Sequence, residues 1–295
     1  MIRSTLNAVL LFSTVLTFQA ESFAQDQQPT EAEVVVKKKF SKLRSKEKKS
    51  MMTALRLIEK GTIDEDENVN QAKEAVLMLS EIGEGVIPKC LTSFPRMIGA
   101  DRLEYLQAAL NNILVDDDLA LALGLSTRKT PNEVYSYLMS RWADSSREDT
   151  EEILIKHLAN ENTEIKYQCV RGLLRIGNEL AIEPCIEIVD TQWVSNKQMI
   201  RKDFSGVSRG IMSDLIHKKI STPNKKARLL GLHLFELFGE KKHASLLVDN
   251  LQNSDTALRL GAINACRVVV DGDKPLLRPS MTELIEMGNA WIAKL

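Results

Sequence analysis

Apolar residues recur in this chain with the spacing of one face of an α-helix. In the segment 227–238, apolar or small side chains stand at offsets 0, 3, 4, 7, 8 and 11. They are Ala227, Leu230, Gly231, Leu234, Phe235 and Phe238. Because an α-helix completes one turn in about 3.6 residues, these positions share one face. The pattern predicts an amphipathic helix with a buried apolar stripe.

The same stripe recurs at intervals of about 31 residues. The seven copies begin at Ala75, Tyr105, Val134, Ile165, Met199, Ala227 and Leu258. The copy at Met199 is the poorest, since it continues only with Ile200, Phe204 and Val207. Such regularity indicates a repeat protein, in which each unit buries its stripe against its neighbours.

A second, shorter helix fits between consecutive stripes. The candidate segments are 86–94, 119–125, 151–158, 181–189, 211–220, 244–251 and 281–287. No segment shows the alternation and hairpin turns of β-strands. The chain is therefore predicted to be all-α, a right-handed α-solenoid of about seven helical pairs over residues 51–295. Residues 51–63 are expected to form an N-terminal capping helix, and the end from Pro275 to Leu295 a C-terminal cap.

Helix start and stop signals agree with this division. Thr130-Pro131-Asn132-Glu133 reads as a capping box with proline at the first helical position, and Thr222-Pro223 repeats the Thr-Pro start. Gly83, Gly177 and Gly239 each follow the end of a stripe. Since helices often end on a left-handed residue, these glycines are predicted to be C-caps.

Short sequence motifs resemble a known repeat family. Ile165-Lys166, Cys169-Val170, Leu173 and Ile176-Gly177-Asn178, followed by Ala181 and Pro184, resemble the short HEAT-like repeat. The segments 234–240 and 82–84 have a similar ending. The resemblance covers about residues 69–290. The period is closer to that of phycobilin-lyase-like proteins than to the usual HEAT unit. The resemblance implies an α-solenoid that presents an extended concave surface, built from its second helices, to a partner.

The first 24 residues have the features of an export signal. Met1-Ile2-Arg3 is followed by the apolar stretch Ala8–Phe18. Ser22-Phe23-Ala24 then has small residues, Ser22 and Ala24, at the two positions that a signal peptidase recognises. We expect cleavage after Ala24, with an uncleaved anchor as the alternative. No cysteine precedes Cys90, so the signal is not of the lipoprotein type. The prediction is a periplasmic or secreted protein with no transmembrane span after cleavage.

Charge is segregated along the chain. Residues 25–50 are polar and then polybasic, and are expected to form a disordered linker. The basic residues of this run are Lys37, Lys38, Lys39, Lys42, Arg44, Lys46, Lys48 and Lys49, against the single acid Glu47. They suggest an electrostatic tether to anionic lipid or envelope polymer; the alternatives are a solvated linker or the first basic helix of the domain. Residues 51–295 carry 30 basic and 35 acidic residues, which argues against nucleic-acid binding.

Each candidate catalytic or metal-binding motif lacks a residue or a structural element that its chemistry requires. Gly206-Val207-Ser208-Arg209-Gly210 matches the serine-hydrolase elbow, but no strand precedes it, so an inter-helix turn is expected. The acidic segment 64–70 begins like a calcium loop but has Val69 where glycine is required. The four histidines lack metal-ligand spacing. We therefore predict no catalytic residue, no metal and no cofactor.

Three further side chains have candidate roles. Cys169 and Cys185 fall in one helical pair, where export would permit a disulfide; buried free thiols are the alternative. Trp193 is a candidate partner contact, with packing between repeats as the alternative.

The sequence thus favours an exported, non-enzymatic scaffold or adaptor that binds a protein or polymer on the concave solenoid surface. One alternative is a cell-envelope attachment protein that uses residues 37–49. The other is a lyase-type enzyme of the HEAT-like class.

Overall fold

The computed structural model describes residues 39–60, 66–97, 99–127 and 130–295. The predicted signal peptide and the start of the predicted linker lie outside these residues. The described chain is all-α: it contains α-helices joined by short turns, and no strand. The helices are α1 (Ser45–Lys60), α2 (Asp66–Ile82), α3 (Ile87–Ser93), α4 (Ala100–Ile113), α5 (Leu119–Gly124), α6 (Asn132–Asp144), α7 (Thr150–Leu158), α8 (Thr163–Arg175), α9 (Ile182–Asp203), α10 (Ser213–Ile220), α11 (Lys225–Phe238), α12 (Val248–Leu251), α13 (Thr256–Cys266) and α14 (Met281–Lys294).

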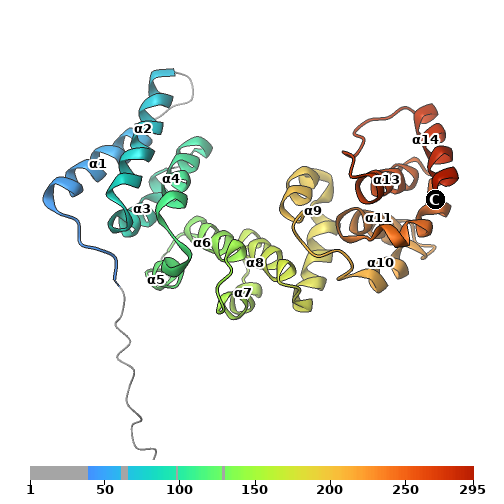
Figure 1. The fold of residues 1–295 in the computed structure, drawn as a ribbon, viewed down its shortest axis with the longest axis horizontal. Helices are drawn as coiled ribbons and strands as arrows, with labels where there is room; N and C mark the ends of the chain where they lie inside the picture. Colours follow the sequence, from blue (N-terminus) through green and yellow to red (C-terminus); the bar gives the residue numbers. More distant parts are fainter. Residues whose placement is uncertain (1–38, 61–65, 98, 128–129) are drawn as a thin grey trace, which may run out of the picture. The chain divides into compact units, whose positions relative to one another are not determined.

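Helices pack mainly against helices that are close in sequence (Figure 1). Among the stripe-bearing helices, α2 packs on α4, α6 on α8, and α11 on α13. Each shorter helix packs on the stripe-bearing helix that follows it: α3 on α4, α5 on α6, α7 on α8, α10 on α11, and α12 on α13. A short 3₁₀ turn leads into α3, α5, α9 and α12. The predicted alternation of long and short helices is therefore present over most of the described chain.

Most stripe positions are buried, as expected. Leu106, Leu138, Leu173, Leu234 and Ala262 are fully inaccessible to solvent and belong to one hydrophobic core. Two stripe positions are exceptions: Ile176 and Met199 are 48% and 41% exposed. Ile176 ends its predicted stripe at the C-cap of α8, whereas Met199 begins the poorest copy, inside α9.

The folded domain begins earlier than the sequence predicts. Residues 45–50, placed in the linker, form the first turns of α1, and the helix ends at Lys60. The Arg44 backbone N–H donates to Glu47 Oε2 at 2.7 Å, which satisfies a polar group at the helix start. Phe40 and Leu43 pack against the core. Because two apolar anchors precede residue 45, the basic run continues directly into ordered structure.

Asparagine and aspartate caps repeat on the same 31-residue interval. The side chain of Asn162 accepts hydrogen bonds from the backbone of α8, Asn224 from that of α11, and Asp255 from that of α13. The backbone N–H of each cap residue also donates a hydrogen bond to the side chain two residues upstream. For example, the Asn162 N–H donates to Asn160 Oδ1 at 2.9 Å. These caps mark where three stripe-bearing helices begin.

One predicted turn does not exist. The segments 181–189 and 199–207 were expected in two helices, but α9 continues unbroken from Ile182 to Asp203. Trp193 stands 31 residues from both Asn162 and Asn224, where those copies have a cap. Tryptophan has no acceptor for a helix N–H, and residues 190–198 contain neither glycine nor proline. No residue in this segment is therefore of a type that commonly ends a helix. The two predicted helices over 181–189 and 199–207 are one helix.

Two other predicted signals differ in detail. Gly83 and Gly177 have φ of 84° and 80°, which confirms left-handed C-caps, but Gly239 has φ −67°. Gly239 is needed for space, since a Cβ there would lie 2.5 Å from the Phe235 carbonyl oxygen. The capping box at Thr130 does not form: its hydroxyl accepts from the Thr127 N–H, and α6 begins at Asn132. A capping box is present instead at α14, between Ser280 and Glu283.

A close approach between α8 and α6 gives a first prediction. A Cβ at Gly172 of α8 would lie 2.7 Å from the Ala143 Cα of α6 and 2.5 Å from a Leu154 methyl group of α7. Gly172→Ala should therefore lower the free energy of unfolding by about 1–3 kcal/mol in urea titrations, because the helices must separate. Gly124→Ala is the matched control, since a Cβ there meets nothing within 4 Å. Equal stability of the two variants would contradict this close packing.

Candidate functional site

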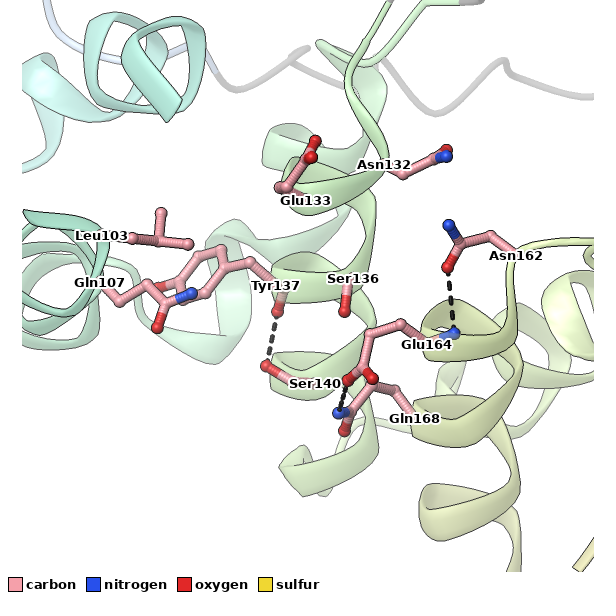
Figure 2. A pocket seen from close by; sticks show the side chains of 10 residues that line it. All are labelled: Leu103, Gln107, Asn132, Glu133, Ser136, Tyr137, Ser140, Asn162, Glu164 and Gln168. Atoms are coloured by element: carbon pink, nitrogen blue, oxygen red, sulfur yellow. Dashed lines mark hydrogen bonds between the residues drawn. The ribbon is translucent and has the colours of Figure 1, made fainter. Parts of the chain in front are cut away.

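A surface hollow lies over the stripe-bearing helices α4, α6 and α8 (Figure 2). Its volume is about 500 Å³. It is lined by Leu103, Gln107, Asn132, Glu133, Ser136, Tyr137, Ser140, Asn162, Glu164 and Gln168. Nine of these ten side chains carry a polar group, and the two charged ones are both carboxylates. We call this surface the polar groove.

The polar groove offers hydrogen-bond acceptors to a ligand. Gln168 Nε2 donates to Glu164 Oε1 at 2.8 Å, which uses the donor end of the amide. Gln168 Oε1 is buried and has no hydrogen-bond partner within the described residues, so the acceptors that a ligand can reach are the exposed carboxylates of Glu133 and Glu164. Glu133 and Glu164 both come from first turns of helices, α6 and α8, where negative charge is stabilised by the helix dipole. A partner that supplies N–H groups or an ammonium group would complement this surface.

An adjoining hollow of about 450 Å³ shares Gln107, Tyr137 and Ser140 with the polar groove. In it, Asn111 Oδ1 accepts from the Tyr137 hydroxyl at 3.0 Å and from Arg141 Nη1 at 2.9 Å. Burial raises the pKa of Tyr137 well above its ordinary value. The phenol therefore stays protonated and donates a hydrogen bond to Asn111.

Arginine side chains connect successive stripe-bearing helices beside these hollows. Arg141 Nη2 donates to the Leu114 carbonyl after α4 at 2.8 Å, and Arg175 Nη1 donates to the Ala143 carbonyl of α6 at 2.9 Å. Arg171 and Arg175 both contact the Asp144 carboxylate, at 3.0 and 2.5 Å. These bonds satisfy carbonyl groups at helix C-termini and hold the groove-forming helices in register.

Trp193 is buried against neighbouring helices, and its role as a partner contact stays a prediction. Its ring stacks on His233 of α11, with centroids 4.4 Å apart and an interplanar angle of 18°. The Arg201 guanidinium lies 5.0 Å from the Trp193 centroid. Only 7% of Trp193 is exposed. The packing alternative is therefore the observed one, and the reason is that the unbroken α9 brings the indole against α11.

The residues around Trp193 include a buried ion pair. Arg201 donates through Nε and Nη2 to the two carboxylate oxygens of Glu236, which is 2% exposed. Burial raises the pKa of Glu236, and the ion pair with Arg201 opposes that rise. Burial, with Arg201 and Lys197 nearby, lowers the pKa of His233 to about 3. His233 is therefore neutral at physiological pH. The sequence did not indicate this cluster, because its members lie up to 43 residues apart in two helices, α9 and α11, and form no recognisable motif.

The predicted basic tether is partly described. Lys37 and Lys38 lie outside the described residues, whereas Lys39, Lys42, Arg44, Lys46, Lys48 and Lys49 are all exposed. Arg44 pairs with Glu47 at 2.6 Å, which leaves the lysines to face solvent from the start of α1. The structure thus places these cations just before and in the first turns of α1, which agrees with the alternative of a first basic helix for residues 45–49.

The other sequence candidates have structural roles or none. Ser208 lies in an inter-helix turn as expected, and the Gly210 N–H donates to the Phe238 carbonyl at 2.9 Å. In the calcium-like segment 64–70, residues 66–70 belong to the start of helix α2, and residues 64 and 65 lie outside the described residues. Within the described ranges, no group of three or more His, Cys, Asp or Glu side chains is placed to hold a metal ion. None of the described helices is long and apolar enough to cross a bilayer.

Comparison with known proteins finds no protein-family model that matches the chain and no curated protein with significant similarity to it. Functional inference therefore depends on the surfaces described above.

All four cysteines are free and buried, including Cys169 and Cys185, so the disulfide alternative is not the observed one. Burial raises the pKa of each thiol to about 12. We expect dithionitrobenzoate to leave the native protein almost unmodified and to titrate four thiols per chain after unfolding in guanidinium without reductant. A titre of two thiols would contradict this arrangement and would indicate a disulfide.

Proposed function

We propose that the protein is an exported, non-enzymatic scaffold whose helical pairs form an α-solenoid and whose polar groove binds an extended segment of a partner protein. Export follows from the signal features of residues 1–24, and the solenoid from the 31-residue repeat. The observation that carries the binding role is the polar groove itself, an open hollow across three consecutive stripe-bearing helices.

The chemistry of the polar groove supports a polypeptide partner with a basic character. Amide and hydroxyl side chains hydrogen-bond the N–H and C=O groups of an extended backbone, whatever its sequence. Glu133 and Glu164 add two negative charges, and no cation lines the groove. A lysine or arginine of the partner would neutralise them. No histidine or cysteine lines the groove, and its tyrosine is held protonated, which supports binding over catalysis.

The binding face in this proposal is formed by stripe-bearing helices. The resemblance to HEAT-like repeats implied a binding surface built from the shorter second helices. The proposed binding face therefore differs from the one that the resemblance implies. The lyase-type alternative gains no support from the groove, because its lining offers no nucleophile activated by a base.

Neutralising the groove tests this proposal. Glu133→Gln with Glu164→Gln should weaken binding of the partner captured from envelope extract about ten-fold, since charge-assisted hydrogen bonds are lost. The matched control is Glu152→Gln with Glu183→Gln, two exposed carboxylates that also lie in first turns, of α7 and α9. Equal loss of binding in both double variants, or in neither, would contradict a role for the polar groove.

Envelope attachment through the start of α1 is a second candidate function. The exposed cations Lys42, Lys46, Lys48 and Lys49 favour it, because they are concentrated on a domain that is otherwise acidic.

Replacing these four lysines by glutamine should shift the protein from the envelope pellet to the soluble fraction at about 0.15 M salt. The control replaces Lys156, Lys202, Lys218 and Lys241, four exposed lysines elsewhere on the domain. Unchanged fractionation of the first variant would exclude the attachment role.

A further inference from the structure

A second hollow lies beside the Trp193–His233 stack, between α9, α11, α13 and the chain at Leu276-Leu277. Its volume is about 230 Å³, comparable to a large amino-acid side chain with its backbone. Its walls include Leu229, Leu260 and Leu276, which pack against the core. Two apolar side chains stand at its rim largely uncovered: Val194 is 92% and Leu277 59% exposed. We call this the Trp193 pocket.

The Trp193 pocket combines apolar walls with an excess of positive charge. Its charged lining residues are Lys197, Arg201 and Glu236, and His233 is neutral. Arg201 and Glu236 compensate one another, whereas Lys197 has no ion-pair partner within the described part of the chain. One positive charge is therefore left over, on a domain whose net charge is negative. Such a pocket complements an apolar group that carries one negative charge.

The ion pair also orients the arginine for a ligand. Because Arg201 uses Nε and Nη2 for Glu236, its Nη1 group remains available. Arg201 is held in place both by Glu236 and by the face of Trp193. A carboxylate bound by both Arg201 and the Lys197 ammonium group would restore charge balance in the pocket.

A further hollow extends from the same ion pair towards the loop after α13. Its volume is about 250 Å³, and it shares Arg201 and Glu236 with the Trp193 pocket. Its other charged residues are Arg209, Lys274 and Asp273, again with one positive charge in excess. A free small carboxylate would fill only the Trp193 pocket. A polypeptide would place its last residue there and its preceding residues in this second hollow.

We propose that the Trp193 pocket binds the C-terminal carboxylate of a partner polypeptide that ends in a large apolar residue preceded by acidic residues. The apolar side chain enters between Leu229, Leu260 and Leu276, and the carboxylate binds Lys197 and Arg201. This site is separate from the polar groove, which selects positive charge, so the two proposals stand or fall independently.

Calorimetric titration with a defined peptide tests the proposal. The probe is acetyl-Gly-Glu-Glu-Gly-Leu-Phe with a free carboxylate, compared with its C-terminal amide and with N-acetylphenylalanine. We expect the free acid to bind at least ten-fold more tightly than the amide, because only the acid completes the charge balance. N-acetylphenylalanine should bind at least ten-fold more weakly than the peptide. Lys197→Met should reduce the advantage of the acid over the amide about ten-fold, whereas Lys202→Met, on the same helix but outside the pocket, should not.

Each contrary result overturns a defined part of the proposal. Equal affinity for the acid and the amide, or no binding of either, excludes a carboxylate site. N-acetylphenylalanine that binds as tightly as the peptide would assign the pocket to a small carboxylate and exclude the polypeptide. The Glu133→Gln, Glu164→Gln variant should bind the peptide like the native protein. Failure at the polar groove is therefore distinguishable from failure here.

Discussion

The fold depends on apolar stripes that no single helical pair can bury alone. Several stripe-bearing helices are covered partly by a shorter helix and partly by a neighbouring stripe-bearing helix, as α8 is by α7 and α6. Close contact requires small residues, and Gly172 of α8 reaches the backbone of α6 at Ala143. Arg141 and Arg175 then bond carbonyl groups at the ends of preceding helices. The surface over α4, α6 and α8 is therefore preorganised by the same packing that stabilises the core.

The continuous helix α9 explains why the two candidate sites differ. It packs on both α8 and α11. Since no cap interrupts it at Trp193, residues Trp193, Lys197 and Arg201 lie along successive turns of one helix. That spacing brings an aromatic ring and two cations together against His233 and Glu236. A helix that ended at Val189 would have separated them.

Helix positions were largely readable from the sequence, whereas the sites were not. The period of the stripe locates most helices because burial on one face is a local property of spacing. The break at 190–198 could have been judged from the missing cap, since Asn162, Asn224 and Asp255 share a register with Trp193. Pairings such as Arg201 with Glu236 depend on which helices meet and at what rotation. The repeat period does not determine these, so the polar groove and the Trp193 pocket emerge only in three dimensions.

Hydrogen exchange on the native protein, with and without its captured partner, tests the central claim most directly. If the partner binds the stripe-bearing helices, amide protection should increase in α4, α6 and α8 and remain unchanged in α5 and α7. Protection confined to α5 and α7 would place the partner on the shorter helices and contradict the account.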